Sequence, residues 1–384
     1  MKKHIILSIL SLTFVFFSCG KYKTPPVYTE QTVFLYMPWS DLYGYFKKNI
    51  EDIESALMMK ESESTRFVCF LASSQTEATL FEMRYFRKNF IKTELKKYNV
   101  GTFTTSDGIR SIIDTVKYHA PSSKYSMIIS SHGQGWLPTT AGKPKKLILN
   151  KNNTETYWQT RYFGCSNSNF QINIPTFVDA IKQSNTFFEY ILFDACYMSN
   201  IEVAYDLKDV ADYLIASPNE IMGYGFPYAL MGEYLLDDVN YEAIVDEYYN
   251  FYLRYAKPCG TIAVTDLSLV DGMADIMKEI NQSFDTSEIQ NNKIQSMDGY
   301  NSTIYYDMGD YLDNLCDNSI IATKANEYLK KLIPYSAHTK TFFVGGFVQK
   351  EININKYSGI TISDNSTSKY AAKKNETDWY KATH

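Results

Sequence analysis

Two apolar runs in this sequence each end on a side chain that can do covalent chemistry. Residues 127–131 lead into His132, and residues 191–195 lead into Cys196. Apolar runs of this length are typical of inner strands in a parallel sheet, where ligands bind beyond the carboxyl ends of the strands. We therefore expect the imidazole and the thiol to lie on the same rim of a sheet. A thiol near a histidine is the arrangement of a nucleophilic cysteine, and it points to cleavage of peptide bonds.

The setting of His132 separates it from the other histidines. It follows an apolar strand and precedes Gly133, whose backbone N–H can approach a bound carbonyl as closely as an oxyanion hole requires. A single histidine is more often structural or exposed, so the inference depends on the pairing with Cys196. The remaining histidines, which show no comparable setting, are His4, His119, His338 and His384.

The cysteines do not form a disulfide framework or a zinc pattern. Five remain beyond Cys19, an odd number without short spacings. Buried cysteines are common in protein cores, and most of these are expected to be structural. Cys196 differs because it ends a strand next to an aspartate. The others are Cys69, Cys165, Cys259 and Cys316.

The beginning of the chain is typical of an export signal. A basic start is followed by an apolar stretch at residues 5–17, which is shorter than the roughly 20 residues that span a bilayer. We predict a signal peptide at residues 1–18. Its end resembles a bacterial lipoprotein signal, which would make Cys19 the lipid-bearing first residue and place the protein on a membrane of the cell envelope. Residues 19–30 would form an extended tether, and plain secretion is the alternative.

Strands and helices alternate through residues 31–228, which predicts a doubly wound α/β fold with a mostly parallel sheet flanked by helices. Residues 229–384 are expected to form a C-terminal α+β part of the same unit. The expected strands are 32–37, 67–72, 79–87, 91–97, 127–131, the run before Cys196, 213–217, 261–265, 341–349 and 357–363. The expected helices are 49–59, 107–118, 174–182, 199–210, 241–255, 267–284 and 308–332.

Composition excludes some classes of function. The 384 residues are 45% hydrophobic with a mean hydropathy of -0.28, which suits a globular protein with a large core. A formal net charge of -5 argues against a nucleic-acid partner. The glycines at 223 and 225 lack the strand–turn–helix setting of a phosphate loop, so a nucleotide site is not expected. No metal-ligand pattern is present.

The two blocks resemble the caspase-like cysteine peptidases, which share an apolar strand ending in His-Gly and another ending in Ala-Cys. Within these, the chain most resembles the clostripain family, also called C11. The resemblance extends from about Gln31 to the C-terminus and includes four further stretches. They are 32–37, Asp194–Met198 with 202–205, 216–220 through 223–228, and 357–362 with 377–380.

The resemblance implies a caspase-like fold and a cysteine endopeptidase. The thiolate of Cys196 would attack the scissile carbonyl, and His132 would activate the thiol or protonate the leaving amine. The backbone N–H groups of Gly133 and Cys196 would form the oxyanion hole. The resemblance implies a peptide or protein substrate and no cofactor. Some relatives depend on calcium, but no loop of the EF-hand kind occurs here.

The family prefers Arg or Lys before the cut, and a buried cation needs a carboxylate partner. Asp194 matches the family's residue for that role, although it could merely hydrogen-bond a neighbouring loop. Glu220 offers additional acidity in the loop after the next strand. Tyr224 and Phe226 in that loop depart from the family's pattern and leave strict basic specificity in doubt.

Lys145 and Lys146 lie in a basic, polar loop between the two catalytic residues. Several relatives are activated by self-cleavage after a basic residue in this region, and nicking concentrates in such loops. We therefore expect processing at Lys145 or Lys146; a solvated loop with no such role is the alternative.

Three other functions remain open at this level. They are a family member with non-basic specificity, a pseudo-peptidase that serves as a surface binding module, and a different hydrolase or transpeptidase that uses the same thioester.

Overall fold

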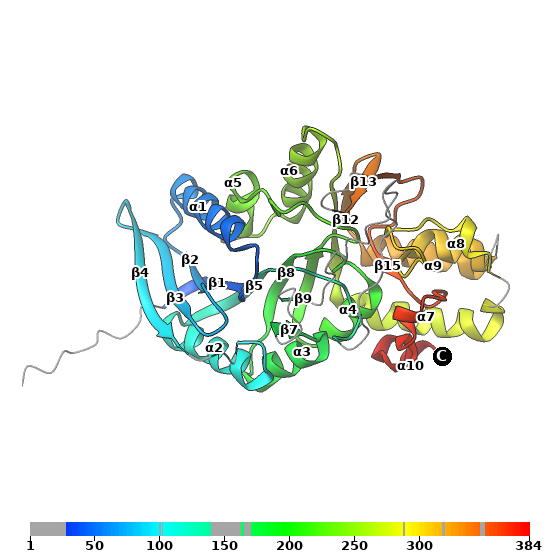
Figure 1. The fold of residues 1–384 in the computed structure, drawn as a ribbon, viewed down its shortest axis with the longest axis horizontal. Coiled ribbons are helices and arrows are strands. Elements are labelled where there is room, and N and C mark those ends of the chain that lie inside the picture. The colour runs from blue at the N-terminus through cyan, green and yellow to red at the C-terminus, as the bar shows by residue number, and fades with distance from the viewer. Residues whose placement is uncertain are drawn as a thin grey trace, which may run out of the picture.

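A sheet of nine strands forms the centre of the computed structural model, and its five middle strands run parallel (Figure 1). The structure describes residues 28–99, 101, 103–139, 163–164, 170–286, 289–316, 319–345 and 350–384. The strand order is β12-β10-β9-β8-β5-β1-β2-β3-β4. The parallel strands are β9 (Ala211–Ala216), β8 (Phe188–Asp194), β5 (Ser122–Ser130), β1 (Thr29–Met37) and β2 (Thr65–Ala72).

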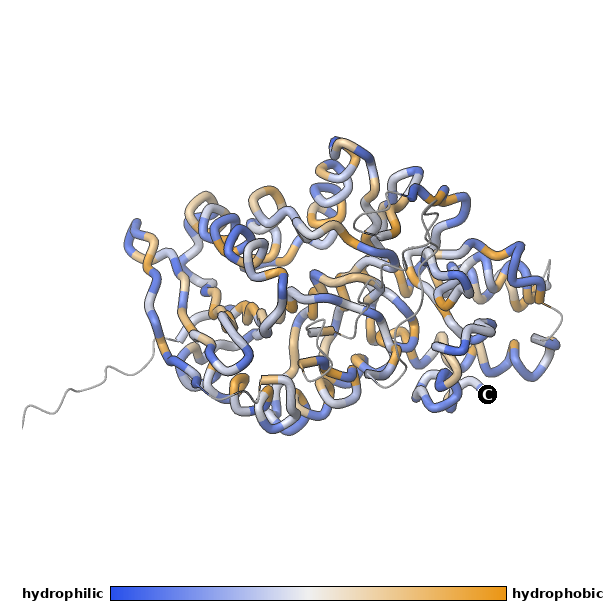
Figure 2. The backbone as a smooth tube through the Cα atoms, viewed as in Figure 1, coloured by the Kyte–Doolittle hydropathy of each residue, from blue (hydrophilic) through white to orange (hydrophobic). Residues whose placement is uncertain are grey.

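Antiparallel strands lie at both edges of the sheet. β3 (Ala78–Phe86) and β4 (Asn89–Tyr98) form a hairpin next to β2, whereas β10 (Thr261–Asp266) and β12 (Tyr335–His338) extend the sheet beyond β9. The sheet is therefore mixed, and the parallel arrangement expected from the sequence holds for its middle. In Figure 2 the hydrophobic stretches include the central strands, whereas the β4 edge is largely hydrophilic.

Helices cover both faces of the sheet, as the doubly wound fold requires. Alternate residues of β1 show why: Val33, Leu35 and Met37 belong to one buried cluster, and Phe34 and Tyr36 to another. The first face carries α1 (Tyr43–Lys60), α5 (Tyr228–Met231) and α6 (Tyr241–Leu253). The second carries α2 (Ser106–His119), α3 (Ile174–Gln183) and α4 (Ile201–Leu207). The α/β fold class is thus confirmed.

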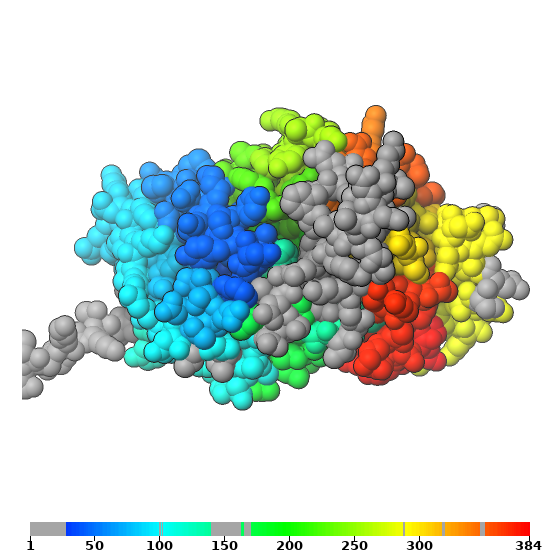
Figure 3. Space-filling view, viewed as in Figure 1, coloured from blue at the N-terminus to red at the C-terminus, as the bar shows by residue number. Residues whose placement is uncertain are grey.

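The C-terminal part adds helices and small sheets at one end of the molecule. Its helices are α7 (Val270–Ser283), α8 (Met308–Cys316), α9 (Ile320–Leu332) and α10 (Asp378–Thr383). Its short strands are β11 (Tyr306–Asp307), β13 (Thr341–Val344), β14 (Lys350–Asn353) and β15 (Thr361–Ile362). Figure 3 shows this yellow-to-red part at the opposite end of the face from the blue and cyan N-terminal part. Because β10 and β12 join the central sheet, the sheet runs across the expected boundary at residue 228.

Several elements differ from their predicted bounds. The helix expected at 199–210 is only Ile201–Leu207. Asn200 caps its start through a hydrogen bond from Val203 N, and residues 208–210 form a turn. The helix expected at 308–332 is divided into α8 and α9. Strand β12 was not predicted, because the sequence Tyr-Ser-Ala-His lacks the apolar run of an inner strand and lies at the edge of the sheet.

Some predictions lie outside the described residues. They are the signal peptide at 1–18, the lipidation site Cys19 and the processing sites Lys145 and Lys146. Cys165 also lies outside the described residues. Within the described part of the chain, no helix has both the length and the apolar character needed to cross a membrane.

Candidate active site

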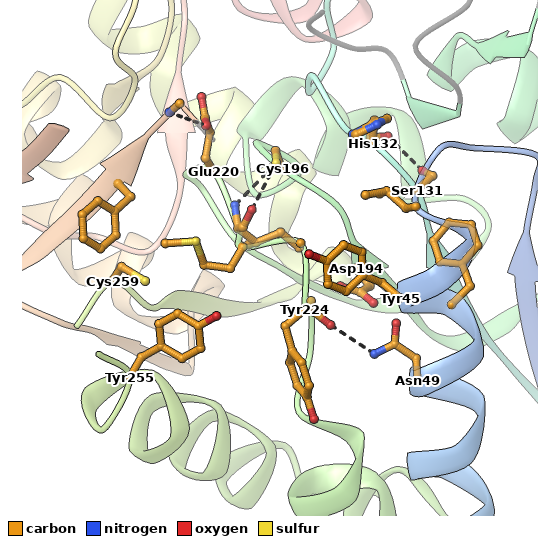
Figure 4. Close-up of a pocket in the computed structure, with 18 of the residues that line it drawn as sticks. Tyr45, Asn49, Ser131, His132, Asp194, Cys196, Glu220, Tyr224, Tyr255 and Cys259 are labelled. Carbon is orange, nitrogen blue, oxygen red and sulfur yellow. Dashed lines mark hydrogen bonds between the residues drawn. The ribbon is translucent and has the colours of Figure 1, made fainter. Parts of the chain in front are cut away.

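The pairing of β5 with β8 brings the two predicted blocks together. Ser130, at the end of β5, lies opposite Asp194, at the end of β8. His132 lies two residues after Ser130, and Cys196 lies two residues after Asp194. Both side chains line one cavity of about 840 Å³ at the carboxyl ends of the parallel strands (Figure 4). The structure therefore places the imidazole and the thiol on the same rim of the sheet.

Gly133 packs directly against the backbone of Cys196. A Cβ atom at this position would lie 2.3 Å from the carbonyl oxygen and 2.8 Å from the amide nitrogen of Cys196. Only glycine fits such a close approach. Gly133 and Cys196, the two residues predicted to form the oxyanion hole, therefore lie next to each other.

The backbone of His132 is held by a small hairpin. β6 (Phe163–Gly164) pairs with β7 (Gln171–Ile172), and Gly164 exchanges two hydrogen bonds of 3.2 Å with the backbone of His132. The imidazole Nε2 lies 2.6 Å from the carboxylate Oδ1 of Asp41, which stands on the loop between β1 and α1. This hydrogen bond lowers the pKa of Asp41 to about 2.

Cys196 lies at a sharp turn after β8. The next residue, Tyr197, has a φ of 59°, in the left-handed region that costs a non-glycine residue about 1–2 kcal/mol. Packing offsets this cost: the Tyr197 ring stacks on Tyr305 at 5.3 Å, and its hydroxyl donates to Glu220 at 2.6 Å. The thiol Sγ accepts a hydrogen bond of 3.4 Å from the backbone N–H of Ile221.

Asp194 presents a buried carboxylate to the same cavity. Its Oδ1 accepts from the backbone N–H of Phe226 at 3.1 Å, and its Oδ2 accepts from Ser130 Oγ at 3.0 Å and Tyr228 OH at 3.2 Å. Burial raises the pKa of the Asp194 carboxyl to about 7. The carboxylate fits because Gly225 (φ +77°) has no side chain; a Cβ there would lie 2.4 Å from Oδ1.

Glu220 also lines the cavity, but its carboxylate already has partners in the protein. Tyr197 OH donates to one oxygen at 2.6 Å, and the backbone N–H of Gly345 donates to the other at 3.0 Å. These contacts join the loop after β9 to the end of the β13 segment. They suit a structural anchor at least as well as direct contact with a substrate.

The other described thiols lack the setting of a nucleophile. Burial raises the pKa of Cys259 to about 12 and that of Cys316 to about 11, and it raises the pKa of Cys69 further. These shifts fit the structural roles expected from the sequence, even though Cys259 lines the same cavity as Cys196. Over the described ranges, His, Cys, Asp and Glu side chains form no group of three or more that could hold a metal ion.

Sequence reasoning missed the part of the site that comes from the β1–α1 region. Tyr45 and Asn49 on α1 line the cavity, and Asp41 contacts His132. A signal for Asp41 was present, because it follows the apolar strand at 32–37 and so stands at the carboxyl end of a parallel strand, as His132 and Cys196 do. Lys257 and Phe343, from distant parts of the sequence, complete one wall and had no such signal.

Comparison with known proteins gives consistent results. A model of the clostripain family matches residues 36–370. The X-ray structure of a secreted C11 cysteine protease from Bacteroides thetaiotaomicron, "iotapain", is 45% identical, with a TM-score of 0.85 over 94% of this chain and 100% of that chain. No curated protein matches the chain.

Two further solved structures are similar. A clostripain from Bacteroides thetaiotaomicron ATCC 29148, in complex with the peptide inhibitor BTN-VLTK-AOMK, is 48% identical, with a TM-score of 0.56 over 58% of this chain and 99% of that chain. An inactive zymogen C11 protease from Parabacteroides distasonis shares the fold at 24% identity, with a TM-score of 0.76 over 94% of this chain and 99% of that chain.

Proposed function

This chain belongs to the clostripain family of cysteine proteases, and we propose that it is an exported endopeptidase in which Cys196 and His132 cut after basic residues. One observation carries the proposal. Two adjacent parallel strands end on these side chains, and both line a single cavity that also contains the buried carboxylate of Asp194. A relative in complex with a peptide inhibitor supports a peptide or protein substrate.

The proposed reaction has two steps, and each residue has one part in them. The Cys196 thiol passes its proton to His132, and Sγ attacks the carbonyl carbon of the substrate. The N–H groups of Gly133 and Cys196 donate hydrogen bonds to the oxyanion that forms. His132 gives a proton to the amine as the C–N bond breaks. Water then attacks the thioester, passes a proton to His132, and releases the new carboxylate from Cys196.

Asp194 is proposed to receive the basic side chain before the cut. It supplies negative charge in a buried wall of the cavity, and the structure gives it hydrogen-bond donors but no cationic side chain as a partner. The negative charge of a buried carboxylate without a cationic partner is poorly compensated, and a bound cation stabilises it. Glu220 adds negative charge to the cavity while it anchors Tyr197 and Gly345.

Export is proposed from the signal-like residues 1–18, with Cys19 as the lipid-bearing first residue of an envelope protein; plain secretion is the alternative. The similar structure of "iotapain" is described as that of a secreted protease, which is consistent with export.

Replacement of either dyad residue should abolish peptidase activity. We expect Cys196→Ala and His132→Ala to lower kcat by at least about 10³-fold, because each residue makes or breaks a bond in the reaction. A fluorogenic panel that varies the residue before the cut would measure this, and thermal melting should show both variants folded. Residual activity in Cys196→Ala well above background would mean that another group is the nucleophile.

Two measurements on the wild-type protein distinguish an endopeptidase from a pseudo-peptidase and from a transpeptidase. A thiol-directed covalent inhibitor should label the wild type at Cys196, and failure to react would favour a pseudo-peptidase. If added amines capture the acyl group in preference to water, the enzyme is a transpeptidase.

Replacement of Asp194 should remove the preference for basic residues. In Asp194→Asn the ratio of kcat/KM for a Lys or Arg substrate to that for a neutral one should fall by about 100-fold or more, since an unpaired buried charge costs about 3–5 kcal/mol. In the wild type this ratio should decline as the pH falls below about 7, because Asp194 is then protonated and uncharged. The matched control is Asp275→Asn, an exposed carboxylate on α7. An unchanged ratio in Asp194→Asn would give Asp194 a structural role.

Self-processing is proposed at Lys145 or Lys146, since Pro144 obstructs a cut after Lys143. Mature wild-type protein should separate into two fragments on a denaturing gel after storage, whereas Cys196→Ala stays whole. The double variant Lys145→Ala/Lys146→Ala should also stay whole. A wild type that remains a single active chain would show that this cut is not part of the mechanism.

A further inference from the structure

We propose that Asp41 is a positioning residue, whose carboxylate binds Nε2–H of His132 and so directs the ring's Nδ1 to the reaction; this rests on the proposed Cys196–His132 dyad. The contact is short, at 2.6 Å between Nε2 of His132 and Oδ1 of Asp41. Ser40 Oγ donates to the same carboxylate oxygen at 3.2 Å. An imidazole has two nitrogens, and the partner of one determines which proton the other can exchange.

Backbone contacts alone do not orient the imidazole of His132. Gly164 fixes the main chain of His132 on both sides, but such bonds do not determine the side-chain torsions of the ring. Asp41 reaches the ring from a different element, the loop between β1 and α1. A third group that orients the base is a recurring requirement of nucleophile–histidine pairs.

Charge adds to the geometric effect. Asp41 remains ionised across the working range, because the bond from His132 lowers the pKa of Asp41 to about 2. The carboxylate therefore stabilises the imidazolium that forms during the reaction. Its side chain is 65% exposed, against 13% for His132, so solvent screens part of this effect.

Other charged groups face the cavity and have partners of their own. Asp194 and Glu220 accept the hydrogen bonds described above, and Lys257 lies 4.0 Å from Glu351. The contact on which the proposal rests is the hydrogen bond between the His132 imidazole and Asp41.

The test compares Asp41→Asn and Asp41→Ala with Asp275→Asn, which removes one exposed negative charge on α7. We expect kcat to fall by roughly 10- to 100-fold in Asp41→Ala and by less in Asp41→Asn, which keeps an acceptor oxygen, with KM within about twofold of the wild type. The alkaline limb of the pH profile of kcat/KM should move to lower pH. A purely structural loop residue would leave that limb in place.

A second readout is independent of peptidase activity. In a Cys196→Ala background with ¹⁵N-labelled histidine, the titration midpoint of the His132 ring should move to lower pH by roughly one unit in Asp41→Asn. Unchanged kcat and an unchanged midpoint would overturn the proposal, and so would a rise in activity, which would make Asp41 an inhibitory contact. If the wild type cleaves no peptide, the proposed function fails while the NMR result still decides the role of Asp41.

A different observation leads to a second inference, which deepens the proposed basic specificity and rests on it: we infer that the pocket prefers Lys to Arg. A carboxylate offers about four acceptor positions, two on each oxygen. In Asp194, Ser130 and Tyr228 use both positions of Oδ2, and Phe226 N uses one of Oδ1. One position remains.

One open position matches an ammonium better than a guanidinium. Arg gains its advantage over Lys through two parallel N–H bonds to both oxygens of a carboxylate. The donors on Oδ2 prevent that arrangement. A Lys ammonium needs a single position on Asp194 and can use a second acceptor. Asn49 lines the cavity near Asp194 and can supply that acceptor (Figure 4). Its amide donates to Tyr224 O, which leaves its carbonyl oxygen to accept from the ammonium.

Tyr228→Phe tests this inference, because it removes one donor from Oδ2 and keeps the buried ring. Wild-type kcat/KM should be higher for a Lys substrate than for the matched Arg substrate, and Tyr228→Phe should shift the ratio toward Arg by about tenfold. Ser130→Ala should act in the same direction. Tyr248→Phe, at a buried ring on α6, is the matched control.

Two results would overturn the Lys preference: a wild type that prefers Arg, or a ratio that neither Tyr228→Phe nor Ser130→Ala moves. If neither basic substrate is cleaved better than a neutral one, the proposed basic specificity itself has failed.

Discussion

The register between β5 and β8 is the constraint on which the site depends. Ser130 lies opposite Asp194, and the three apolar pairs before them, Met127 with Ile191 through Ile129 with Phe193, bury both faces of the sheet. Because side chains alternate with a period of two, a slip by one residue would move Asp194 away from Ser130 and exchange which residues face each layer of helices. The same burial that stabilises the core therefore places His132 beside Cys196.

The site holds arrangements that a protein selected for stability alone would avoid. Tyr197 has a left-handed backbone, and Asp194 is a buried carboxylate to which the structure gives no cationic side chain. Both are tolerated because their surroundings compensate: Tyr197 stacks and donates to Glu220, and three donors satisfy Asp194. Strain and unpaired charge that persist at such cost usually mark the position of a reaction or a ligand.

The sequence predicted those parts of the fold whose signal is local. The runs before His132 and Cys196 are apolar on both faces, which is why their strands, their neighbourhood in the sheet and the fold class could be predicted. Edge strand β12 has no such pattern, and the cap at Asn200 shortens a helix that periodicity alone extends. Asp41 was missed for a different reason: its place after the apolar strand at 32–37 was a local signal, but its contact with His132 spans 91 residues and has no local pattern.

The C-terminal part contacts the loops that follow β5 and β8, on which His132 and Cys196 lie. Tyr305 OH donates to the carbonyl of Gln134, two residues after His132, and Trp136 Nε1 donates to Ser363 Oγ. On the nucleophile side, Thr361 N donates to the carbonyl of Ser199, and the backbone of Ser363 donates to Glu202 on α4. Both loops thus meet the segment around residues 361–363. The relative position of His132 and Cys196 therefore depends on contacts with the C-terminal segment as well as on the sheet.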